Sequence, residues 1–80
     1  MRKVKLRKAN LHNADLRRAK LNGADLRKVD LSGANLSGAD LRKSRLTKAN
    51  VSRADMRGTD LRKANLRGTD LKTAKGVRDN

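Results

Sequence analysis

The side chains that could do chemistry in this 80-residue chain are one histidine, His12, and aspartates such as Asp40 and Asp60, which stand twenty residues apart. A histidine acts as a general base only with an oriented neighbour and a pocket, and the sequence around His12 indicates neither. Two stacked carboxylates could share a proton or hold a cation, but Arg42 and Arg62 follow this pair. Cysteine is absent, and no phosphate loop, zinc-ligand spacing or nucleophile elbow occurs. We therefore expect no enzyme, catalytic residue, metal or cofactor, with His12 solvated and the aspartates structural.

Positive charge is the dominant feature of the composition. Lysine and arginine number 22 against 8 acidic residues, for a formal net charge of +14, and there is no aromatic residue. No apolar stretch follows the basic opening, so we expect no secretory signal, no membrane span and a cytoplasmic location. The charge points to polyanionic partners: nucleic acid, an anionic membrane surface or an acidic protein. On composition alone, it is also typical of a disordered chain.

An internal repeat argues against disorder. Aliphatic residues occupy every fifth position from Leu6 to Leu71, fourteen times without a slip, and all but Val51 and Met56 are leucine. A small residue lies two positions before nearly every centre, and Asp or Asn lies one position before eleven of the fourteen. A random polar sequence would not keep this phase over seventy residues, so the repeat indicates a folded solenoid.

A period of five fits neither regular element. Five residues of α-helix advance about 500°, which places successive leucines about 140° apart. On a straight strand, an odd step sends each side chain to the opposite face. The leucines share one interior if the chain turns a corner of roughly 90° after each unit, so that four units close a coil. The small residue and the centre then both face inward, because they are two positions apart.

The units ANLHN, ADLRR, ADLRK, ANLSG, ADLRK and ANLRG resemble the A(D/N)LXX signature of pentapeptide-repeat proteins. The resemblance covers Val4 to Thr73, nearly the whole chain. It implies an all-β solenoid, a right-handed quadrilateral β-helix of about four coils with 20 residues per coil. We expect a single domain, 1–80, with regular repeats at 4–73 and a short tail at 74–80.

Local chemistry suits the corners of such a coil. Five glycines end their units, where positive φ would suit a type II turn. The Asp or Asn of each unit is expected to bond nearby backbone, as these side chains do in turns. The glycines in question are Gly23, Gly33, Gly38, Gly58 and Gly68.

Stacking residue n on residue n+20 assigns the surface charges to four sides, each named here after one central residue. The Leu26 side (units of Leu6, Leu26, Leu46 and Leu66) carries a net +7, and the neighbouring Leu41 side (units of Leu21, Leu41 and Leu61) a net +5. The Leu36 side (units of Leu16, Leu36 and Met56) has +3, and the Leu31 side (units of Leu11, Leu31, Val51 and Leu71) is neutral. The candidate polyanion-binding residues on the two basic sides are Arg2, Lys3, Arg7, Lys8, Arg27, Lys28, Arg42, Lys43, Lys48, Arg62, Lys63 and Arg67.

Several functions fit this pattern. The first is a non-enzymatic repeat scaffold or interaction module with an unknown partner, for which the charge serves only solubility. The alternative is polyanion binding, to nucleic acid or an anionic surface, through the two basic sides. Some pentapeptide-repeat proteins protect type II topoisomerases by imitating duplex DNA; that role requires an acidic rod, so a charge of +14 disfavours it. The near-perfect repeat is also typical of a designed sequence.

The ends of the repeat lack a visible cap. Solenoids normally cap their terminal repeats, but here the pattern breaks at Gly76, where a leucine is due. An open end leaves leucines in water and an unpaired edge. We expect either an end-to-end homodimer or a weakly ordered terminal coil.

Overall fold

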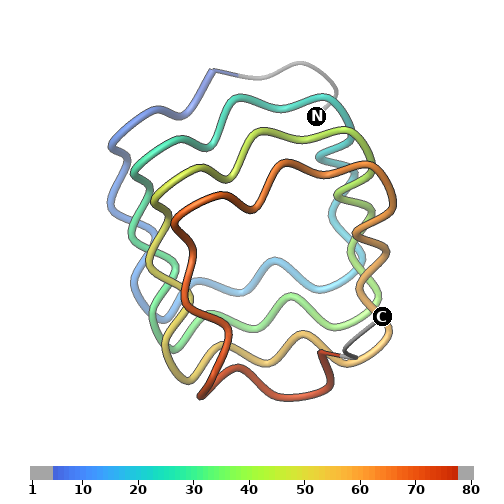
Figure 1. Cartoon of the computed structure of the whole chain (residues 1–80). Helices are drawn as coiled ribbons and strands as arrows, with labels where there is room; N and C mark the ends of the chain where they lie inside the picture. The colour runs from blue at the N-terminus through green and yellow to red at the C-terminus, as the bar shows by residue number, and fades with distance from the viewer. Residues whose placement is uncertain (1–4, 78–80) are drawn as a thin grey trace.

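The computed structural model describes residues 5–77, which wind into a tube of stacked coils (Figure 1). Parallel bridges join each described bridging residue to the one twenty positions later, from Lys5↔Asp25 to Asp55↔Lys75. The register of twenty residues per coil is therefore as the repeat predicted. Since a turn interrupts the chain every five residues, each coil has four sides.

The pairing between coils is sparser than an all-β solenoid suggests. Residues 5–77 contain no helix and no extended strand, and the β structure consists of isolated parallel bridges. Most units supply one bridging residue, at the position just before the aliphatic centre. The physical reason is the length of the unit: the corner turn takes two of five residues and leaves too few for a longer ladder. Among the described residues, no helix could span a membrane.

Each corner is a tight turn that begins at the aliphatic centre. The Leu6 carbonyl accepts the Ala9 N–H at 3.0 Å, and the same bond recurs unit after unit. The residue just before the donor, which is Lys8 in this unit, has positive φ. The five glycines predicted for this position have φ between 69° and 76°. Eight units hold an L-residue there instead, with φ between 58° and 63°: Lys8, Asn13, Arg18, Lys28, Lys43, Lys48, Arg53 and Lys63.

The predicted bonding of Asp and Asn to local backbone is confirmed. In all eleven units with Asp or Asn before the centre, Oδ1 accepts the backbone N–H two residues later, as Asn35 does from Ser37 at 3.1 Å. This bond satisfies a donor at the corner that would otherwise need water. Lys5, Lys20 and Arg45 occupy this position in other units and cannot accept such a bond.

The core is the line of inward-facing residues between Leu21 and Met56. Leu26, Leu36 and Leu46 are fully buried, and the small residues between them are nearly so. Polar residues at small positions are satisfied: the Ser44 hydroxyl donates to the Leu41 carbonyl at 2.7 Å, and the Thr59 hydroxyl donates to a main-chain carbonyl of the preceding coil. The terminal leucines are only half-buried, because they lack a neighbouring coil on one side: Leu6, Leu11, Leu16, Leu61, Leu66 and Leu71.

Candidate polyanion-binding surface

The predicted binding residues lie on the outside of the tube where the structure describes them. Arg2 and Lys3 fall outside the described residues. Of the other ten, Arg27 is half-buried and the rest are exposed. The bridges Lys5↔Asp25, Asp25↔Arg45 and Arg45↔Asn65 bring the units of the Leu26 side together in the expected order. Lys20↔Asp40 and Asp40↔Asp60 do the same for the Leu41 side.

Ion pairs within units neutralise much of the acidic charge. The Arg42 guanidinium donates from Nε to Asp40 Oδ1 at 2.9 Å and from Nη2 to Oδ2 at 2.8 Å. Such two-point contacts fix the orientation of both groups. The same geometry joins Asp15 to Arg17, Asp25 to Arg27, Asp55 to Arg57 and Asp60 to Arg62. Each of these units reads Asp, centre, Arg, a sequence signal from which the pairing could have been found.

These pairs change the ionisation of the aspartates. Hydrogen bonding to its own arginine lowers the pKa of Asp15, Asp25, Asp40 and Asp55 to about 2. The Arg62 guanidinium likewise holds the pKa of Asp60 below its ordinary value. All five carboxylates are therefore anionic at neutral pH, and their arginines hold them on the tube surface.

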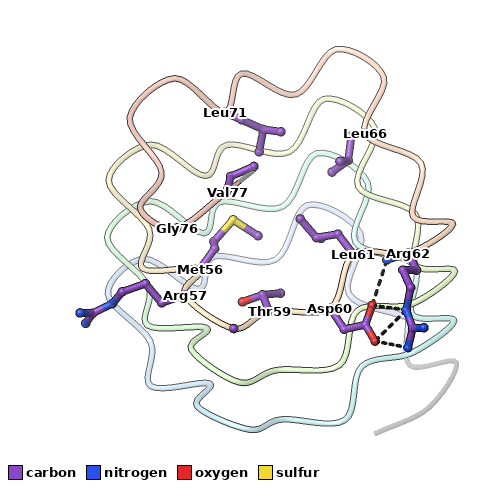
Figure 2. Close-up of a pocket in the computed structure, with 11 residues that line it drawn as sticks. Met56, Arg57, Thr59, Asp60, Leu61, Arg62, Leu66, Leu71, Gly76 and Val77 are labelled. Atoms are coloured by element: carbon purple, nitrogen blue, oxygen red, sulfur yellow. Dashed lines mark hydrogen bonds and ion pairs between the residues drawn. The ribbon is translucent and has the colours of Figure 1, made fainter. Parts of the chain in front are cut away.

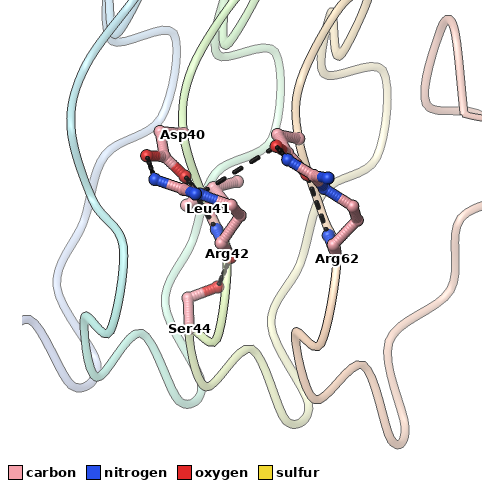
Figure 3. A network of polar contacts seen from close by, with 6 residues as sticks. Asp40, Leu41, Arg42, Ser44 and Arg62 are labelled. Carbon is pink, nitrogen blue, oxygen red and sulfur yellow. Dashed lines mark hydrogen bonds and ion pairs between the residues drawn. The ribbon is translucent and has the colours of Figure 1, made fainter.

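On the Leu41 side, the pairs are also linked between coils. Arg42 Nε lies 4.0 Å from Asp60 Oδ2, so Asp40, Arg42, Asp60 and Arg62 form a row of alternating charges (Figure 3). The stacked carboxylates Asp40 and Asp60 thus lie among guanidinium groups. Among residues 5–77, no three His, Cys, Asp or Glu side chains gather in a way that could hold a metal.

Within residues 5–77, the Leu26 side has the most basic residues outside ion pairs. Within the described residues, the Leu41 side keeps three basic residues outside ion pairs, Lys20, Lys43 and Lys63. The Leu26 side has a single pair, Asp25 with Arg27. Its other basic residues make no ion pair within residues 5–77, and they are Lys5, Arg7, Lys8, Lys28, Arg45, Lys48 and Arg67.

His12 is on the outer surface, as expected, but it is bonded rather than only solvated. Its Nδ1 lies 2.9 Å from the Ser32 carbonyl and 2.8 Å from Ser32 Oγ, and its Nε2 lies 3.1 Å from Asn13 Nδ2. The Ser32 hydroxyl donates to Asp30 Oδ1 at 2.6 Å. With its proton committed to a carboxylate, Ser32 is not activated by the imidazole, and the cluster ties two successive coils at a corner.

A tube of five-residue units with a 20-residue coil defines the class of parallel β-helical solenoids. The chain belongs to the pentapeptide-repeat family: the family model "Pentapeptide repeats" matches residues 1–33 and 34–72 in eight copies. Its solved members form right-handed quadrilateral β-helices. No curated protein matches the chain.

Solved structures of three relatives resemble this one. A pentapeptide repeat protein of the Arabidopsis thaliana thylakoid lumen is 34% identical over 81% of this chain, with a TM-score of 0.79. A pentapeptide repeat protein from Nostoc PCC 7120 is 41% identical over 89% (TM-score 0.53), and HetL from the same organism, involved in regulating heterocyst differentiation, is 36% identical over 95% (TM-score 0.57). This chain spans 45%, 63% and 41% of those proteins, respectively.

Proposed function

We propose that this protein is a non-enzymatic interaction module of about four coils, acting in the cytoplasm, that binds a polyanion through its Leu26 side. The observation that carries the proposal is the distribution of ion pairs. Five arginines are held by aspartates of their own units, and within residues 5–77 the Leu26 side keeps seven basic residues outside such pairs, more than any other side. A phosphate backbone would supply the missing counter-charges, with contacts that do not depend on sequence.

A column of lysines marks the centre of this surface. Lys8, Lys28 and Lys48 occupy the same corner on three successive coils, which neighbouring strands would place about 4.8 Å apart. Like charges stacked across a ladder are destabilising, and each lysine also has positive φ, near 60°. The fold gains nothing from lysine at these corners, because glycine fits the same backbone at Gly68. A bound polyanion would turn the repulsion into attraction.

Salt dependence of binding to duplex DNA tests the proposal. Each phosphate contact contributes about −0.9 to the slope of log K against log salt concentration. Reversing Lys8, Lys28 and Lys48 to Glu should weaken binding at every salt concentration and reduce the slope by about 3. Circular dichroism would verify that the variant stays folded.

A matched variant separates the site from general charge. Arg53, Lys72 and Lys75 are also exposed and lie on the Leu31 and Leu36 sides. Reversing these three changes the net charge equally but should leave the slope nearly unchanged. Equal losses in both variants would show that only net charge matters and would refute the site. An acidic protein is the second candidate partner. Its binding constant for this protein would fall much less steeply with salt concentration, since fewer counterions are released.

A further inference from the structure

Over the described residues, the C-terminal end of the tube is open and apolar. Met56, Leu61, Leu66, Leu71 and Val77 surround a hollow of about 1040 Å³ that opens at this end (Figure 2). Leu61, Leu66 and Leu71 are half-buried there, whereas Leu41 and Leu46, one coil earlier, are fully buried. Another coil of the same shape would complete the burial of these leucines.

Hydrogen bonds between interior coils have a fixed direction. The N–H groups of the centre and of the corner residue donate toward the C-terminal side, as Leu41 does to Asp60 at 2.9 Å and Lys43 to Arg62 at 3.0 Å. In return, the bridging residue of the later coil donates its N–H to the carbonyl of a small residue on the earlier coil, as Asp60 does to Ala39 at 2.9 Å. Each unit therefore presents two donors and one acceptor to its C-terminal neighbour.

Within residues 5–77, the last coil presents the same set to no following coil. Within residues 5–77, the N–H groups of Leu61, Lys63, Leu66 and Gly68 and the carbonyl of Ala64 have no backbone partner. The first coil presents the complementary set. There, the carbonyls of Asn10, His12, Asp15 and Arg17 and the N–H groups of Asn10 and Asp15 have no backbone partner within the described residues.

We propose that a second copy of this chain stacks head-to-tail on the C-terminal end, so that its first coil continues the ladder. Only opposite ends match. If two C-terminal ends met, both would present two donors for each acceptor, and donors would be left unpaired. If two N-terminal ends met, both would present an excess of acceptors. Such an interface is heterologous, and repetition extends it into longer stacks. This proposal does not depend on the proposed polyanion binding.

Charge sets the conditions for stacking. Two copies at +14 each repel, and salt screens that repulsion while leaving the apolar contact intact. The mean mass in sedimentation equilibrium should therefore rise with protein concentration, and more so at 1 M than at 0.05 M NaCl. A constant mass of 8.9 kDa at millimolar protein and 1 M NaCl would overturn the proposal.

Complementary variants test the direction of stacking. Leu66→Lys places a charge in the C-terminal opening, and Leu6→Lys places one at the N-terminal end. Each variant alone should stay monomeric. In an equimolar mixture, the intact C-terminal end of Leu6→Lys can stack on the intact N-terminal end of Leu66→Lys, so dimers should form and grow no further. Ser52→Lys adds the same charge to a side and should assemble like the parent chain. If Leu6→Lys alone dimerises, the ends join C-terminus to C-terminus and the head-to-tail proposal is wrong.

Discussion

Gly76 packs its backbone directly on the backbone of Arg57, one coil below. A Cβ added at Gly76 would lie 2.7 Å from the Arg57 Cα and 2.9 Å from its backbone nitrogen, distances that real Cβ atoms do not reach. The φ of Gly76 is 81°, so an L-residue there would also be strained. The residue that interrupts the repeat is thus what lets the last segment lie on Met56, whose N–H donates to Lys75 at 2.9 Å.

Gly76→Ala should therefore loosen the C-terminal segment by about 1–3 kcal/mol, the range for strained backbone. Hydrogen exchange of the Lys75 N–H, bonded to the Ala54 carbonyl at 2.8 Å, would report the loss. Gly58→Ala is the control, because its φ is 72° but the nearest atom would be 3.6 Å away. The control should cost less, since it adds strain without a clash, and equal effects would contradict the packing described here.

Left-handed corners occupied by L-residues should be sites of easy stabilisation. Arg53 has φ 58° and no ion pair within the described residues. Arg53→Gly should be more stable than Arg53→Ala by about 1 kcal/mol, because both remove the charge but only glycine relieves the left-handed backbone. Urea unfolding measures the difference. Equal stability of the two variants would show that these corners are unstrained.

At the position before the centre, the hydrogen bond to the backbone should matter more for stability than whether the residue is Asp or Asn. Asn65 Oδ1 accepts the Arg67 N–H at 3.1 Å, and Asn65 bridges to Arg45 on the preceding coil. Asn65→Ala should lower the free energy of unfolding by about 1 kcal/mol, the typical value of one hydrogen bond. Asn65→Asp keeps the acceptor and adds a charge opposite Arg45, so its stability should not fall. A loss from Asn65→Asp as large as that from alanine would contradict this role.

Acid should destabilise the fold through its paired aspartates. Their folded pKa of about 2 lies below the unfolded value of about 3.9, so the stabilisation is present above the unfolded pKa. It is lost as pH falls from about 5 to about 2. Thermal unfolding across this range should show a falling Tm, and a flat profile would argue against the ion pairs.

A single variant checks the cause of this pH dependence. The main reason for the low pKa of Asp15 is its hydrogen bond to Arg17. In Arg17→Gln, the pKa of the Asp15 carboxyl should rise toward its ordinary value, as followed by NMR titration. The carboxyl of Asp55, two coils away, serves as an internal reference and should titrate unchanged.

The sequence by itself determined the family, the twenty-residue coil and the inward set of side chains. The reason is that each unit is short: five residues bury one centre and one small side chain, and only a regular quarter-turn does so fourteen times. It also located the Asp and Asn bonds at the corners, because such bonds depend on residues only two positions apart.

Tertiary structure alone decided three things. Positive φ at Lys28 and seven other L-residues follows from the ladder, since Lys28 must donate its N–H to Thr47 on the next coil. The link from Arg42 to Asp60 on the next coil follows from the stacking of the coils, which a count of charges for each side does not give. The close approach of the Gly76 backbone to Arg57 is a contact between coils that local pattern does not encode.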